Sequence, residues 1–213
     1  MWTTKLLGAL FLTVNCLSGG CDPGSLDTEH NTSTLEGTDD EVEFAVSATA
    51  ATECDLKSSL LVNGNFSADL ASWTTEIHEP ASATISAVLD GATNKVVRVR
   101  NSKVQDFYKV QFWQPVTSIE KDHCYRVCFR AKASADREIQ VQLIKNAAPW
   151  GSYGLWWPQA ITSKWTTYKT EFWANSTASD GRLAFAFGAN TSAAYIDNVV
   201  LIDRGDVDDC KIP

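Results

Sequence analysis

The sequence has little of the material from which most catalytic and metal centres are built. Its 213 residues include one methionine and three histidines, and no His-Glu-x-x-His motif is present. The Gly-x-Ser-x-Gly motif of serine hydrolases and the phosphate-binding loop of nucleotide-binding enzymes are also missing. These absences argue against zinc-protease, serine-hydrolase and nucleotide-dependent chemistry.

Basic charge and long apolar runs are scarce as well. Lys and Arg total 18 against 26 Asp and Glu, which gives a net charge of −8 and no basic cluster. Nucleic-acid binding requires clustered Lys and Arg, so it is not expected. The apolar stretch at residues 6–14 is too short to span a bilayer. No sustained helical periodicity follows residue 54, which argues against an α-helical fold.

The acidic charge is confined to one segment. Residues 22–53 contain nine Asp and Glu residues, no Lys or Arg, and Phe44 as their single aromatic side chain. Such a segment has too little apolar surface to offset the entropy of ordering it, so we expect a disordered linker. Residues 54–213 contain 17 acids and 17 bases and are predicted to form one folded domain.

Residues 1–21 have the features of an export signal. Lys5 precedes the apolar stretch, and the small residues 18–20 precede Cys21. This arrangement resembles a bacterial lipoprotein signal, in which Cys21 would be lipidated and would anchor the chain in a membrane. The alternative is ordinary signal cleavage and secretion. Both predict an exported protein, which is a cell envelope or cell surface lipoprotein in the first case and a secreted protein in the second.

The folded part is predicted to consist of β-strands. Ten short segments with alternating apolar and polar residues are separated by turn signals such as Asp90-Gly91 and Asp180-Gly181. About ten strands without intervening helices favour an antiparallel β-sandwich or barrel. The predicted strands cover residues 60–62, 74–78, 84–89, 96–100, 109–116, 124–131, 138–145, 166–174, 182–188 and 194–203.

Four cysteines lie outside the signal region, in a chain whose export permits disulfides. Cys124 and Cys128 are four residues apart on one predicted strand, about 13 Å, which is too far for a disulfide between them. Cys54 and Cys210 flank the domain, and domain ends are often close. We therefore favour a Cys54–Cys210 disulfide with two free strand thiols. The alternative is that Cys124 and Cys128 each pair with one terminal cysteine.

Four sequence segments, in order, resemble the carbohydrate-binding modules of families 4 and 9. Residues 60–66, Leu-Leu-Val-Asn-Gly-Asn-Phe, followed by Trp73, are similar to the family's opening. Residues 125–133 resemble its Tyr-x-Val-x-Phe-x-Ala-Lys-Ala strand, and residues 165–172 resemble its Trp-x-x-Tyr-x-x-x-Phe strand. Residues 195–201, Tyr-Ile-Asp-Asn-Val-Val-Leu, resemble its closing strand.

This resemblance implies a jelly-roll β-sandwich that binds polysaccharide and is usually attached to glycoside hydrolases. It also implies a structural calcium ion, for which Asp197 matches the family's closing ligand. Asn65 and Ser67 stand where the family usually has opening carboxylates. We expect a monomeric, non-catalytic binder of a polysaccharide or other glycan.

The best candidates for sugar binding are aromatic and planar polar side chains. The segment 149–158 holds three tryptophans and one tyrosine between glycines and prolines, so it is predicted to be an exposed loop. Arg and Gln offer several donors in a plane for sugar hydroxyls. The candidates are Trp150, Tyr153, Trp156, Trp157, Trp113, Gln140, Gln142, Arg98 and Arg100, with weaker support for Gln111 and Tyr108.

Two other functions remain open from the sequence. The domain has the residues for a two-carboxylate glycoside hydrolase, because Glu76, Glu79, Asp106 and Glu138 lie on or near predicted strands. A jelly roll can also serve as a protein-contact scaffold or adhesin. Sugar release would identify the hydrolase, and capture of an envelope protein without glycan binding would identify the scaffold.

Overall fold

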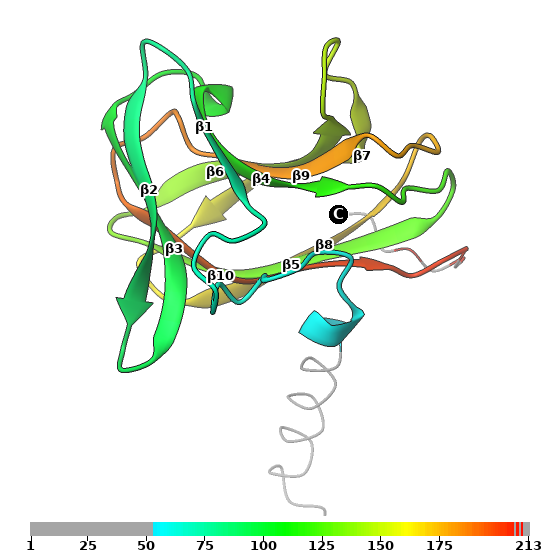
Figure 1. Cartoon of the computed structure of the whole chain (residues 1–213), viewed down its shortest axis with the longest axis horizontal. Coiled ribbons are helices and arrows are strands. Elements are labelled where there is room, and N and C mark those ends of the chain that lie inside the picture. The colour runs from blue at the N-terminus through cyan, green and yellow to red at the C-terminus, as the bar shows by residue number, and fades with distance from the viewer. Residues whose placement is uncertain (1–52, 207, 209, 211–213) are drawn as a thin grey trace, which may run out of the picture. The chain divides into compact units, whose positions relative to one another are not determined.

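Two antiparallel five-stranded sheets pack face to face in the part of the chain that the structure describes. This computed structural model describes residues 53–206, 208 and 210. The predicted signal (1–21), including Cys21, and residues 22–52 of the predicted linker lie outside the described residues. Figure 1 shows the two layers, with the strands of one sheet above those of the other.

The strand order is that of a sandwich in which neighbours in sequence often lie in different sheets. Sheet A has the order β1-β4-β9-β6-β7 and sheet B the order β2-β3-β10-β5-β8. Two short 3₁₀ helices, η1 (Leu56–Ser58) and η2 (Phe107–Lys109), accompany them. The strands are β1 (Thr74–Ile77), β2 (Ser82–Asp90), β3 (Asn94–Lys103), β4 (Val110–Val116), β5 (Cys124–Ala133), β6 (Arg137–Lys145), β7 (Ser152–Ile161), β8 (Thr166–Trp173), β9 (Gly181–Ala186) and β10 (Ala194–Asp203).

The core between the sheets is aromatic. Phe112 of β4 and Phe185 of β9 stack with ring centroids 5.1 Å apart. Phe129 of β5 meets Phe185 edge-on at 5.2 Å, so the rings of the two sheets interlock. The apolar members of each alternating strand point into this core, as the sequence predicts.

The all-β sandwich is confirmed, and nine of the ten predicted strands are present within a few residues of their expected bounds. The tenth prediction, a strand at residues 60–62, is wrong. This segment lies beside β10 but is not a strand of either sheet. Leu60 donates its backbone N–H to Leu201. The Gln114 side chain then makes two hydrogen bonds to the backbone of Val62, at 2.7 and 2.9 Å, where a neighbouring strand would otherwise bond.

The predicted loop at residues 149–158 is also wrong, because most of it lies on strand β7. Pro158 is tolerated there since β7 is the edge strand of sheet A, where a missing N–H disrupts no further ladder. Gly154 has φ +114°, which accompanies a register shift between Leu143 and Ile144 on the neighbouring β6. Glycine and proline therefore mark an irregular edge strand here.

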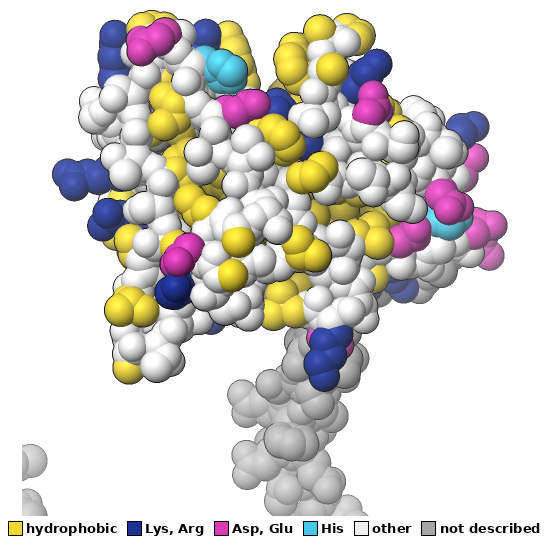
Figure 2. Space-filling view, viewed as in Figure 1, with side chains coloured by type: hydrophobic (Ala, Val, Ile, Leu, Met, Phe, Trp, Pro, Cys, Tyr) yellow, Lys and Arg dark blue, Asp and Glu magenta, His cyan; other side chains and the backbone are white. Residues whose placement is uncertain are grey.

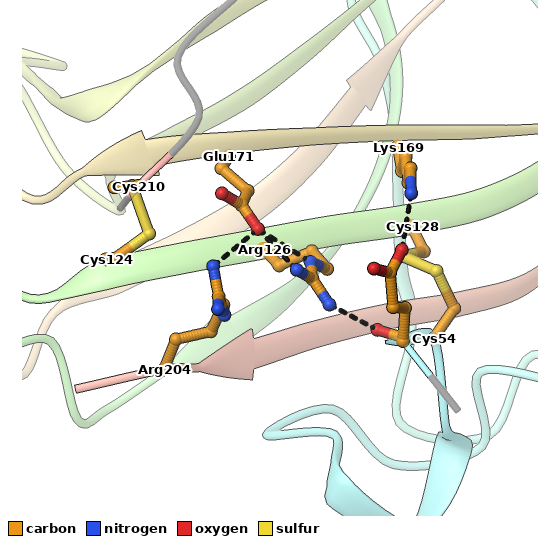
Figure 3. Close-up of polar contacts among 9 residues, drawn as sticks. Cys54, Cys124, Arg126, Cys128, Lys169, Glu171, Arg204 and Cys210 are labelled. Carbon is orange, nitrogen blue, oxygen red and sulfur yellow. Dashed lines mark hydrogen bonds and ion pairs between the residues drawn. A yellow bond between two sulfur atoms is a disulfide. The ribbon is translucent and has the colours of Figure 1, made fainter. Parts of the chain in front are cut away.

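The disulfide pairing we favoured, Cys54–Cys210, is wrong, and the alternative holds. Cys54 is bonded to Cys128 and Cys124 to Cys210, with Cα separations of 5.9 and 5.7 Å. Both strand cysteines face outward from β5, so each end of the domain reaches a different position along that strand. Figure 3 shows the two bonds on the outer face of sheet B.

An ion cluster fills the space between the two disulfides (Figure 3). The buried Glu171 carboxylate on β8 accepts hydrogen bonds from Arg126 at 2.5 and 2.9 Å and from Arg204 at 2.8 Å. Arg126 also donates to the backbone carbonyl of Glu53 at 3.1 Å, and the Glu53 carboxylate pairs with Lys169. The start and end of the domain are therefore fixed to β5 by covalent and ionic contacts together.

Disulfides of this kind fit an exported protein, since reducing compartments do not preserve them. Among the described residues, no helix combines the length and hydrophobicity that crossing a bilayer requires.

Candidate functional site

The outer face of sheet A combines small side chains at its centre with amides and aromatic rings on either side. The central strand β9 presents Ala184 and Ala186 to this face. Because these side chains are small, the surface is recessed at the middle of the sheet. Hydrogen-bonded neighbours line up across the strands in two rows, Trp113–Ala184–Gln142–Trp156 and Gln111–Ala186–Gln140–Pro158.

Two adjoining hollows lie on this face and together form a groove. The first has a volume of about 590 Å³ and the second about 460 Å³. They share Tyr108, Gln142 and Trp156, so they are parts of one depression. Figure 2, with the outer face of sheet A at the top, shows the surface hollowed between two projections. The first hollow is further lined by residues 104–107, Gln140 and Ala189, and the second by Glu76, His78, Lys109, Gln111, Ile144, Trp150 and Arg182.

Two of the four predicted aromatic residues of segment 149–158 reach the groove. Trp156 is 65% exposed and Trp150 is 53% exposed. Trp157, next to Trp156 on a regular strand, points the other way and meets Phe129 of the core at 5.6 Å. Tyr153 packs against the core and donates a hydrogen bond of 2.5 Å to Asp180. That bond raises the pKa of the Tyr153 hydroxyl to about 12.

The groove floor is built from amides that are almost covered. Gln111, Gln140 and Gln142 are each 3–5% exposed. The Gln111 side chain donates a hydrogen bond of 2.5 Å to the backbone carbonyl of Tyr108. This bond connects Tyr108, which is 52% exposed and borders the groove, to the groove floor. The Gln140 Nε2 group is buried and has no hydrogen-bond partner within the described residues. A buried N–H donor without an acceptor is costly, and this one belongs to a side chain that lines the first hollow.

The structure does not bring Arg98 and Arg100 to these glutamines. Both arginines lie on β3 in sheet B, where Arg98 pairs with Tyr195 of β10. Their outward direction was predicted correctly, but they face away from the core on the opposite side of the sandwich. Trp113 lies on the outer face of sheet A, with the Arg182 guanidinium 5.0 Å from its ring centroid.

Sequence reasoning missed Arg182 and the ion pair that it forms with Glu76 at 3.1 Å across sheet A. The available signal was a single arginine at an outward position of a strand that otherwise carries small and apolar residues. The sequence alone marks Glu76 only as a candidate hydrolase acid, because its partner is 106 residues away in sequence and no local pattern joins them.

The surroundings of Asp197 do not fit a calcium site. Its carboxylate accepts hydrogen bonds from the Asn94 amide at 3.1 Å and from the Asn198 backbone N–H at 2.8 Å. The Arg130 guanidinium lies 3.8 Å away. Burial raises the pKa of this carboxyl, and each of its oxygens already accepts a hydrogen bond from an N–H donor.

Neither Asn65 nor Ser67 adds a carboxylate to this end of the domain, and Asn65 accepts a hydrogen bond from the Ser67 backbone N–H. Within the described residues, the one close group of three metal-ligating side chains is Cys124, Glu171 and Cys210, whose cysteines are bonded to each other.

Comparison with known proteins identifies a matching family and solved structures of similar fold. The family model described as a carbohydrate binding domain, of the CBM 4/9 type, matches residues 58–193. A solved family 4 carbohydrate-binding module (CBM4) is 22% identical, with a TM-score of 0.58 over 67% of this chain and 98% of that one. The enzymatically active domain of tailspike protein 4 of bacteriophage CBA120 is 12% identical, with a TM-score of 0.53 over 68% of this chain and 21% of that one. No curated protein sequence matches the chain.

Gly154 fixes the course of β7 two residues before Trp156. A Cβ atom there would lie 2.1 Å from the backbone oxygen of Trp173, and the φ of +114° is strained for other residues. We expect Gly154→Ala to lower the free energy of unfolding by more than about 1 kcal/mol. Chemical denaturation followed by fluorescence measures this change.

Gly151→Ala is the matched control, because nothing lies within 4 Å of its added Cβ. Its free energy of unfolding is expected to stay within about 0.5 kcal/mol of the wild type. Equal stability of the two variants would contradict the role assigned to Gly154.

Proposed function

The chain belongs to the carbohydrate binding domain family, and we propose that it binds one polysaccharide chain in the groove on the outer face of sheet A. The observation that supports this most is the pair of exposed rings, Tyr108 and Trp156, standing over nearly buried glutamine amides. Sugar rings have apolar C–H faces and a rim of hydroxyls. Aromatic rings suit the faces, and amides suit the hydroxyls because each offers donors and an acceptor.

The charges around the groove favour an uncharged chain. Glu76 and Arg182, which both line the second hollow, neutralise each other. Lys109 donates to the backbone carbonyl of Glu79 at 3.2 Å and lies over the Tyr108 ring. The domain as a whole carries equal numbers of acids and bases from residue 54 onward. A neutral glucan, xylan or mannan suits these surroundings.

We further propose that the domain binds sugar without hydrolysing it. Of the four acids considered from the sequence, Glu76 and Asp106 line the groove, one in each hollow. The Glu76 carboxylate is held by Arg182, so it is not placed as a free acid beside a scissile bond. Glu79 and Glu138 line neither hollow.

Removal of the Trp156 ring is expected to weaken binding roughly tenfold or more, since stacking on one aromatic ring contributes about 1–3 kcal/mol in a comparable setting. Isothermal titration of the whole chain against soluble β-glucan, xylan and mannan measures the affinity. The double variant Gln140→Ala/Gln142→Ala is expected to weaken it as well, because the hydroxyl partners are lost.

Arg98→Ala/Arg100→Ala is the matched control, since it changes polar side chains on the other sheet and should leave the affinity unaltered. Unchanged binding by the Trp156 and glutamine variants would reject this site. Release of reducing sugar from the same panel would favour the hydrolase, and binding of an envelope protein in place of any glycan would favour the scaffold.

We propose that the domain folds without calcium, with Asn94, Asn198 and Arg130 acting on the Asp197 carboxylate. Thermal unfolding is expected to give the same midpoint in excess calcium and in excess chelator. A midpoint several degrees higher in calcium, abolished by Asp197→Asn, would instead support the ion that the family resemblance implies.

We propose that the exported chain is held in a membrane by lipid on Cys21. Growth of the producing bacterium with a labelled fatty acid is expected to label the wild type and not Cys21→Ser. Cys16→Ser, which changes the other cysteine of the signal, should keep the label. An unlabelled wild type would contradict the lipid anchor and would support a secreted protein instead.

A further inference from the structure

Arg182 lies at the end of the groove where strand β9 begins, and its side chain is almost completely covered. The guanidinium carbon is 5.0 Å from the ring centroid of Trp113 and 5.1 Å from that of Trp150. These are cation–π distances to both indoles. One indole belongs to the sheet and the other to the segment between β6 and β7.

The same guanidinium is also held by polar groups on the same face of sheet A. Its Nη1 atom is 3.1 Å from the Glu76 carboxylate on β1, and its Nη2 atom is 3.4 Å from the Gln111 amide oxygen on β4. A charged group this deeply covered is stable only when it is paired. The pairing also fixes the plane of the guanidinium, which decides where an indole can stack on it.

The Trp150 ring is only partly covered by the rest of the domain. It is 53% exposed and lies outside the strands, between the end of β6 and the start of β7. Its backbone is pinned, with φ 53° and an N–H bond to Ala147 at 3.0 Å. A pinned backbone still leaves the two side-chain torsions free to rotate. The contact with Arg182 opposes that rotation, and both residues line the second hollow.

The two hollows of the groove are therefore not equivalent. The first is walled by residues 104–108 and has the buried Gln140 amide beside it. The second contains Trp150, Arg182 and Glu76. A short glycan can lie against Trp156 and Tyr108, which border both hollows, without reaching Trp150. A longer chain must continue into one hollow or the other.

We propose that Arg182 is a positioning residue that makes Trp150 a platform for an additional sugar unit at the far end of the groove. This inference rests on the proposed function. Arg182 acts through Trp150, and the ligand unit on that platform is a further neutral pyranose of the same chain. Arginine suits this role better than lysine, because its planar guanidinium stacks on indoles and binds the carboxylate at the same time.

The dependence on chain length distinguishes this role from general stabilisation of the fold. The probes are the three-unit and six-unit oligosaccharides of β-1,4-glucose, β-1,3-glucose and β-1,4-xylose, titrated into the whole chain. For the series that binds, Trp150→Ala is expected to lower the six-unit affinity roughly tenfold. Arg182→Gln is expected to lower it about three- to tenfold. The three-unit affinity should stay within about twofold in both.

Arg100→Gln is the matched control, since it removes an arginine from sheet B and should change neither affinity. If Arg182→Gln does not fold, Glu76→Gln replaces it, because it releases the guanidinium from one side and is expected to act in the same direction with a smaller effect. Equal losses for the short and the long oligosaccharide would overturn the proposal, as would an unchanged six-unit affinity.

A second measurement needs no sugar. In ¹⁵N-labelled whole chain, the Trp150 indole N–H is assigned by its absence in Trp150→Phe, and its heteronuclear NOE reports ring motion. The ring is expected to be rigid in the wild type and mobile in Arg182→Gln, while the Trp156 indole is unchanged. A Trp150 ring that stays rigid in Arg182→Gln would overturn the proposal. Failure of every oligosaccharide to bind the wild type would instead count against the proposed function, and the indole measurement would still decide the link between Arg182 and Trp150.

Discussion

The interlocking phenylalanines between the sheets determine which side chains reach either surface. Phe112, Phe129 and Phe185 are fully buried and come from both sheets. Because strand residues alternate between faces, burying one ring sends its neighbours outward. The amides of Gln140 and Gln142 and the ring of Trp156 are thus placed on one outer surface by residues that never touch a ligand. A shift of one residue in any of these strands would exchange the groove for core, so the aromatic packing also fixes the register.

What the sequence predicts well is what depends on that alternation. The inward direction of Val141 and Leu143 and the outward direction of Gln140 and Gln142 follow from local spacing alone, and the structure agrees. The same spacing predicts that Arg98 points outward. Spacing along one strand says nothing about which sheet the strand joins, however, and strand partners here are separated by up to a hundred residues. The grouping of arginines with glutamines therefore had no local basis.

The remaining differences have the same origin in long-range contacts. Gly154 and Pro158 punctuate a loop in most sequences, yet an edge position and one close approach to Trp173 make them compatible with β7. The cysteine pairing depends on which end of the chain arrives at which position of β5, and nearness of the two ends in space is too coarse to decide this. No local pattern marks Arg182 as a site residue. Its role depends on contacts with Glu76 and Trp150, which distant segments supply.

The attachment of both chain ends to the outer face of sheet B has a mechanical consequence. The groove lies on the outer face of sheet A, so an immobile polysaccharide and an anchor upstream of Cys54 would pull on opposite faces of the sandwich. Through the Cys54–Cys128 bond, such a pull would reach β5, which is flanked by β10 and β8. Load applied to an interior strand must be resisted by hydrogen bonds on both of its sides, whereas an edge strand would peel from one. A covalent bond to an interior strand therefore lies where the sheet resists tearing best.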